Sequence, residues 1–146
     1  MTVTAVQKNA EALTMVLTTE LDASPERVWQ LWADPRQLER WWGPPTYPAT
    51  FNQHDLAPGS HVAYYMTGPE GDRPHGYWEI VEADAPRTLV FRDGFANEDG
   101  SPNPEFPVTT VRSVKWLASV ANPAAPMGDP IMNSNGCVLA SFLRTS

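Results

Sequence analysis

The strongest constraint on the fold is the order of local signals, because both helix starts come before nearly all of the strand-like segments. Ser24 and Asp34 each stand directly before a proline, an arrangement that favours a capped first helical turn. Residues 43–45 (GPP) cannot continue a helix and end the second one. Helices grouped before a run of strands indicate an α+β protein with an antiparallel sheet and exclude a parallel doubly wound one.

The expected strands are rich in aromatic and β-branched residues and are bounded by glycine and proline. Alternating apolar and polar residues predict a first strand over residues 12–22. The further strands are predicted at 47–55, 61–67, 76–83, 88–93 and 108–114 or a few residues beyond, with a long loop at 94–107. We therefore expect one strand, two short helices and a meander of about five strands.

The composition narrows the classes of partner. The chain has 146 residues, the size of one domain, and 17 acidic against 10 basic residues give a net charge of -7. Such a charge disfavours nucleic acid and anionic membrane surfaces. No apolar run approaches the roughly 18 residues of a membrane-spanning helix. Cys137 is the single cysteine, and residues 1–12 lack the features of a secretory signal, so we expect a cytoplasmic protein.

Two segments carry a family resemblance, residues 23–29 (ASPERVW) and 38–44 (LERWWGP). Together with 54–59 (HDLAPG) and 76–80 (GYWEI), they resemble the activator-of-heat-shock-protein-90-ATPase homologue family of the START and birch-pollen-allergen-like (SRPBCC) superfamily. The resemblance covers about residues 8–112, so we assign residues 1–112 to the core of one domain. It implies a helix-grip fold, in which a curved antiparallel sheet and a long C-terminal helix enclose an apolar cavity, with two short helices closing one end.

The C-terminal region departs from this family. After Arg112 the charged residues are only Lys115, Asp129 and Arg144, and prolines interrupt the region at positions 123, 126 and 130. Proline disrupts a helix interior, so the long C-terminal helix is expected to be absent or atypical. Residues 137–144 are the only part that could form two helical turns. We expect 113–146 to be an aberrant segment that completes the same domain.

Two explanations of this segment stay open. We favour a changed reading frame or a truncated gene, because charge and helical pattern disappear at one point; the alternative is divergence of a surface tail. Either way, the family helix that would cover the inner face of the sheet is missing. A large uncovered apolar face is unusual for a monomer, so we expect the tail or a second copy of the chain to cover it.

Large rigid rings suit both core packing and an apolar cavity. Most of the tryptophans, which follow helical spacing beside apolar neighbours, are expected in the core. Alternation along the strands does not decide which face is concave, so Tyr64 and Met66 stay alternatives to Tyr65, and Val90 to Phe91. The candidates for lining the cavity are Trp42, Phe51, Gln53, Tyr65, Trp78, Ile80 and Phe91.

The sequence offers little support for catalysis. His54, His61 and His75 form no metal-binding pattern, so no metal site is expected. His54 beside Asp55 could supply a general base, but neighbours on a regular strand face opposite ways, and solvated strand-end residues are the favoured interpretation. Neither a Gly-x-Ser-x-Gly elbow nor a glycine-rich phosphate loop occurs, and no cofactor is expected.

These observations favour a non-catalytic domain that binds a small hydrophobic molecule. The family resemblance supports an alternative, interaction with a chaperone ATPase. A second alternative is an enzyme of the polyketide cyclase or dehydratase kind found elsewhere in the superfamily. Fold alone does not decide among the three.

Overall fold

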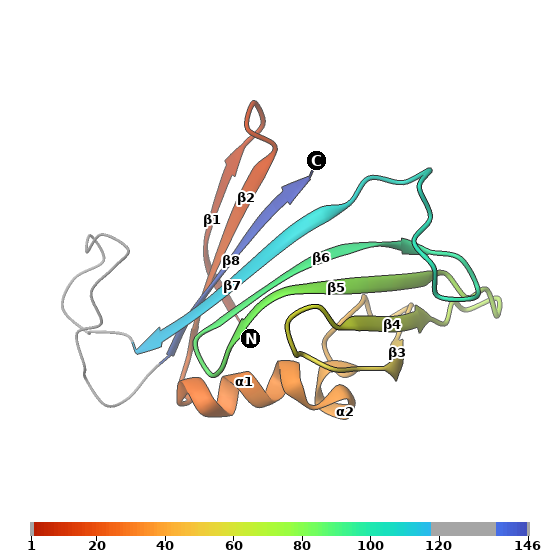
Figure 1. Cartoon of the computed structure of the whole chain (residues 1–146). Helices are drawn as coiled ribbons and strands as arrows, with labels where there is room; N and C mark the ends of the chain where they lie inside the picture. Colours follow the sequence, from red (N-terminus) through yellow and green to blue (C-terminus); the bar gives the residue numbers. More distant parts are fainter. Residues whose placement is uncertain (1, 118–136, 146) are drawn as a thin grey trace.

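The structure is a computed structural model that describes the backbone of residues 2–117 and 137–145 and the side chains of residues 5–113. Within these ranges two short helices and eight strands follow one another (Figure 1). Their bounds are β1 (Thr2–Asn9), β2 (Thr14–Leu21), α1 (Pro25–Ala33), α2 (Pro35–Leu38), β3 (Ala49–Gln53), β4 (His61–Met66), β5 (His75–Asp84), β6 (Thr88–Ala96), β7 (Thr109–Leu117) and β8 (Cys137–Thr145). The predicted α+β class is confirmed.

All eight strands form one sheet in the order β1-β2-β8-β7-β6-β5-β4-β3, and every neighbouring pair is antiparallel. The sheet is strongly curved, and α1 and α2 lie together beside its β3–β6 part (Figure 1). Among the residues that the structure describes, α1 and α2 are the only helices. The prediction that the long C-terminal helix is absent or atypical therefore holds for the described part of the chain.

Side-chain caps start both helices as predicted. Ser24 accepts a hydrogen bond from the N–H of Arg27 at 3.2 Å. Asp34 caps α2, and its carboxylate accepts from the N–H of Arg36 at 2.9 Å and from the side chain of Gln37 at 3.0 Å. The bond from Gln37 and then that from Arg36 lower the pKa of Asp34, because both stabilise the charged carboxylate. The local signals thus fix where the helices begin.

The prediction of a single strand before the helices is wrong, because β1 and β2 form a hairpin. In its turn, Asn9 Oδ1 accepts from the N–H of Ala12 at 3.0 Å, and Leu13 adopts a φ of 51°. Residues 10–13 (AEAL) contain neither glycine nor proline, the usual markers of a turn. Asn9 supplies the turn through its side chain instead, a weaker signal in the sequence.

Residues 137–144, the only part of the C-terminal region that could form two helical turns, form a strand instead. They belong to β8, which pairs with β2 on one side and β7 on the other over the full length of the strand. An isolated helix of two turns leaves most of its terminal backbone groups unpaired, whereas a strand between two others pairs them on both sides. Pairing with β2 and β7 therefore determines that residues 137–144 form a strand.

The predicted strand 88–93 ends too early, because β6 continues to Ala96. Gly94 looks like a strand end in the sequence, but in the sheet it makes room for the ring of Tyr77 on the neighbouring strand. A Cβ atom at Gly94 would lie 2.7 Å from Tyr77 Cε1. The structure also shortens the predicted strand 47–55 to β3, with an irregularity between Phe51 and Gln53.

The core lies between the two helices and the β3–β6 part of the sheet. Trp32 of α1 and Leu38 of α2 are buried against the strands. The rings of Trp78 and Phe91 stack with centroids 4.3 Å apart, and both side chains are fully buried. This dense aromatic packing lies beside the site described next.

Candidate functional site

The larger cavity of the described structure has a volume of about 530 Å³ and lies beside the aromatic core. Aromatic and aliphatic side chains make up most of its wall. It is lined by Trp41, Trp42, Gly43, Tyr64, Met66, Pro74, His75, Asp93, Gly94, Phe95, Pro107 and Thr109. Most of these residues come from the segment after α2, from β4 and from β6, which the chain brings together only in the folded sheet.

Strand alternation aims Asp93 at the aromatic core. Asp93 of β6 lies directly opposite Trp78 of β5, and opposed residues of an antiparallel pair share one face of the sheet. Phe91 and Phe95 stand two residues away on either side, so β6 presents an acid between two aromatic residues on that face. A carboxyl group is thereby placed in an apolar wall.

Tyr64 reaches across one whole strand to meet Asp93. Its hydroxyl donates to Asp93 Oδ1 at 3.1 Å, although β5 separates their two strands. Gly76 of β5 lies directly opposite Tyr64 and makes this path possible, because a Cβ atom there would lie 2.2 Å from Tyr64 Cζ. The tyrosine and the glycine together build the polar point of the cavity.

Burial dominates the electrostatics of this pair. Loss of solvation raises the pKa of Asp93 to about 6, against a smaller lowering effect of the Tyr64 hydroxyl and the Trp78 indole. The same burial, together with the nearby carboxylate, raises the pKa of Tyr64. Asp93 is thus a carboxyl group whose ionisation falls unusually close to neutral pH, while Tyr64 stays a hydrogen-bond donor.

Two indole N–H groups of this cluster are buried without a hydrogen-bond partner in the described structure, those of Trp42 and Trp78. The ring of Trp42 meets that of Trp78 edge to face at 4.8 Å and that of Tyr64 at 6.1 Å. Trp41, in contrast, donates its indole N–H to Leu31 O at 3.1 Å. A buried unsatisfied donor is unfavourable by about 1–3 kcal/mol.

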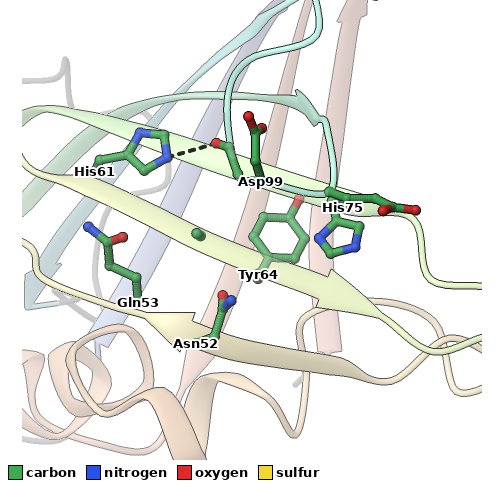
Figure 2. A pocket seen from close by; sticks show the side chains of 9 residues that line it. Asn52, Gln53, His61, Tyr64, His75 and Asp99 are labelled. Atoms are coloured by element: carbon green, nitrogen blue, oxygen red, sulfur yellow. Dashed lines mark hydrogen bonds between the residues drawn. The ribbon is translucent and has the colours of Figure 1, made fainter.

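A smaller hollow of about 150 Å³ contains mainly polar side chains and lies under the loop that follows β6 (Figure 2). His61 points at this loop, and its Nε2 donates to Gly100 O at 3.1 Å. Its ring also stacks on Tyr77 at 5.6 Å. Asp99 accepts from the N–H of Ser101 at 2.9 Å. Since these groups hold the loop in place, we interpret this hollow as structural.

His54 and Asp55 do not form an acid–base pair. The His54 ring packs edge to face against Phe51 and Trp78, with centroid distances of 5.8 and 6.5 Å. Its Nε2 is buried without a partner among the described residues, and desolvation lowers its pKa. Asp55 accepts from the N–H of Ala57 in the following turn at 3.0 Å. His54 is therefore a core histidine that favours the neutral form.

The seven sequence-predicted residues fall into four places. Trp42 lines the larger cavity. Tyr65 lies under the guanidinium group of Arg73, 5.2 Å from its ring centroid, and Gln53 lines the smaller hollow. The other four are buried in the core beside the cavity: Phe51, Trp78, Ile80 and Phe91. Ligand contact by any of the seven stays a prediction.

Sequence reasoning missed Asp93 and Phe95 and kept Tyr64 and Met66 only as alternatives to Tyr65. A usable signal was present, because Phe91, Asp93 and Phe95 keep the strand period of two straight through the presumed loop start at Gly94.

Within the described residues, no group of three or more histidine, cysteine, aspartate or glutamate side chains could hold a metal ion. None of the described helices is long and apolar enough to cross a membrane.

The comparisons with known proteins agree with this architecture. The family model described as "Activator of Hsp90 ATPase homolog 1-like protein" matches residues 22–113. Among solved structures, protein Ms6760 from Mycobacterium smegmatis is 39% identical over 99% of this chain and 80% of its own, with a TM-score of 0.77. A protein from Arthrobacter aurescens is 41% identical over 99% of this chain and 75% of its own, with a TM-score of 0.81.

A more distant structure, CalU16 from Micromonospora echinospora, is 17% identical with a TM-score of 0.52 and covers 90% of this chain and 60% of its own, which shows likeness of fold alone. No protein of curated function matches the sequence. The family model spans more than half of the chain, and the two bacterial relatives cover nearly all of it. The chain therefore belongs to the activator of Hsp90 ATPase homolog 1-like family.

Proposed function

We propose that this protein binds a small, mainly apolar molecule in the larger cavity and holds it without chemical change. The observation that carries the proposal is an aromatic-walled cavity of about 530 Å³ with few polar groups, among them the hydrogen-bonded Tyr64–Asp93 pair. Small-molecule sites have this size and this mixture of many apolar groups with few polar ones. Membership of a family of ligand-binding-type domains supports the same role.

We favour binding over catalysis because the two histidines considered as a base, His54 and His75, pack against other rings. A cyclase or dehydratase needs a base that is positioned to take a proton from the substrate. The candidate base of the sequence, His54, packs in the core and does not line the cavity. His75 does line it, but its ring packs on Tyr65, with a centroid distance of 5.8 Å. A catalytic turnover that is measurable in the wild type and lost in His75→Gln would support the enzymatic alternative.

A homodimer remains part of the proposal, together with a cytoplasmic location. Phe95 and Phe106 are 51% and 47% exposed, and their rings lie 4.8 Å apart beside the cavity. A second copy packed there would bury both rings. A chaperone as partner rests on the family name alone, and copurification with a chaperone ATPase in the absence of ligand binding would favour it.

The test of binding is a fluorescence titration of the full chain with the neutral apolar probe N-phenyl-1-naphthylamine. The wild type is expected to show saturable enhancement. Met66→Trp fills the cavity and is expected to weaken binding at least about tenfold, because the added ring occupies the space of the probe. Tyr65→Trp is the control, since it introduces the same indole ring at the neighbouring position outside this cavity. Non-saturable enhancement, or equal weakening by both variants, contradicts the proposal.

A further inference from the structure

The larger cavity has an acid in its wall and no fixed cation to neutralise it. Of the residues that line it, only Asp93 is acidic, and none is lysine or arginine. The next residue on β6, Arg92, alternates to the other face and pairs with Glu79 at 3.4 Å in an exposed salt bridge. None of the salt bridges found among the described side chains includes Asp93. Its negative charge is thus left for another molecule to balance.

The carboxylate also keeps free hydrogen-bonding capacity. The described structure gives it one hydrogen bond, the donation from Tyr64 to Oδ1. The Trp78 indole lies close enough to lower the pKa of Asp93 but makes no hydrogen bond by distance and angle. An ionised carboxylate accepts about four hydrogen bonds, so Oδ2 and part of Oδ1 remain open to donors on a ligand.

The neighbouring rings favour the same kind of ligand group. Trp41, Trp42, Tyr64 and Phe95 line the cavity beside Asp93. The face of an aromatic ring attracts a cation, most strongly for tryptophan, and the attraction grows as water is excluded. Aromatic rings around an uncompensated carboxylate form a site for a cation and repel an anion of the same size.

We propose that the cavity selects lipophilic amines, with the protonated nitrogen on the Asp93 carboxylate and the apolar body against Trp41, Trp42 and Phe95. This inference rests on the proposed binding function and adds the charge of the ligand to it. Neutral molecules of the same shape bind more weakly, and fatty acids bind most weakly because their carboxylate meets that of Asp93.

Three probes of equal length test the inference: octylamine, octan-1-ol and octanoate, each displacing N-phenyl-1-naphthylamine at pH 7.5 and 0.3 M salt. The salt screens the general attraction of an acidic protein for cations. In the wild type the amine is expected to bind at least about tenfold more tightly than the alcohol, and octanoate more weakly than the alcohol. Equal binding of amine and alcohol overturns the inference but leaves the proposed function intact. Failure of the neutral probe to bind overturns the function itself.

Two variants with the same change of charge locate the effect. Asp93→Asn is expected to abolish the preference for the amine over octanol, measured as the ratio of the two affinities in the same variant. Glu79→Gln removes an exposed acid at the neighbouring strand of the same sheet, and the preference is expected to persist. A preference that survives in Asp93→Asn, or disappears in Glu79→Gln, overturns the assignment to Asp93.

A measurement on the wild type keeps the test independent of variant folding. By linkage, a bound cation lowers the apparent pKa of the carboxyl group that it touches. Carboxyl carbon NMR of Asp93 is expected to show this lowering with octylamine and no change with octanol. The groups around Asp93 are Tyr64 from β4, Trp78 from β5 and His75 at the cavity wall, and the His75 ring resonances report its own titration separately. An unchanged Asp93 titration in saturating octylamine overturns the inference.

Discussion

Asp93 makes the folded protein less stable as the pH rises, and Asp93→Asn removes this effect. The variant keeps the size of the side chain and an oxygen that can accept from Tyr64 Oη, but it carries no charge. Glu79→Gln serves as the control, because Glu79 is exposed on the neighbouring strand. The difference in free energy of unfolding between Asp93→Asn and wild type is therefore expected to depend on pH, and that of Glu79→Gln is not.

The size and direction follow from the pKa of Asp93, which burial raises from 3.8 to about 6. The folded protein thus holds this proton more tightly than the unfolded chain. The stabilisation is fully present below pH 3.8 and is lost as the pH rises to about 6. Each pKa unit corresponds to about 1.4 kcal/mol, so the loss is at most roughly 3 kcal/mol. As the pH rises from 3.8 to about 6, the free energy of unfolding of Asp93→Asn should increase by about 2–3 kcal/mol relative to that of the wild type.

Urea unfolding of both proteins at a series of pH values between 4 and 7.5 measures this difference directly. Comparison with the variant is needed because His54 acts in the opposite direction: its lowered pKa removes stability from the wild type as the pH falls below 6.5. Both proteins share the His54 contribution, and it cancels in the difference. A difference that stays constant with pH, or that changes most above pH 6.5, would refute the burial argument for Asp93.

Three further predictions follow from the packing. Gly76→Ala places a Cβ 2.2 Å from Tyr64 Cζ; the ring must move, and we expect loss of the Tyr64–Asp93 bond, about 1–3 kcal/mol lower stability and weaker probe binding, measured by urea unfolding and titration. His54→Leu is expected to reduce the loss of wild-type stability below pH 6.5, measured by thermal unfolding at pH 5.5 and 7.5. His61→Ala removes the bond to Gly100 O; amide exchange in residues 97–103 is expected to accelerate while global stability falls by only about 1 kcal/mol.

The helix starts could be predicted because their causes are local. Ser24 and Asp34 each satisfy backbone N–H groups within three residues, so a short stretch of sequence contains the whole interaction. The strands from β4 to β7 were predictable in position for a similar reason, since alternation and flanking turns are properties of a few neighbouring residues. Their approximate ends follow, with Gly94 as the exception.

The site was harder to predict because its causes are not local. The path of Tyr64 to Asp93 depends on the register of three strands and on the missing side chain of Gly76. Sequence alone gave the alternation on each strand but not which of its two faces is concave, so Tyr65 and Tyr64 stayed equal candidates. The predicted cavity residues accordingly include core residues such as Phe91 beside Trp42, which lines the larger cavity.

The conformation of residues 137–144 could not be predicted for the same reason, because it depends on residues that are distant in the sequence. Their apolar residues fit a short helix or a strand, and the choice depends on β2 and β7, whose residues lie far away in the chain. Intrinsic preference is a weak guide when two open strand edges compete with it.

The position of β8 has a consequence for how the chain is made. Thr14 of β2 pairs with Arg144, so the β1–β2 hairpin joins the rest of the sheet only through β8, the last of the described strands to be synthesised. Until that strand leaves the ribosome, the β1–β2 hairpin and strands β3 to β7 cannot be hydrogen-bonded into one sheet. The edges of β2 and β7 are then both unprotected. Pairing of β2 with β8 closes a long loop in sequence and is therefore slow. Before it is complete, two newly made chains would most readily associate through the unpaired edges of β2 and β7.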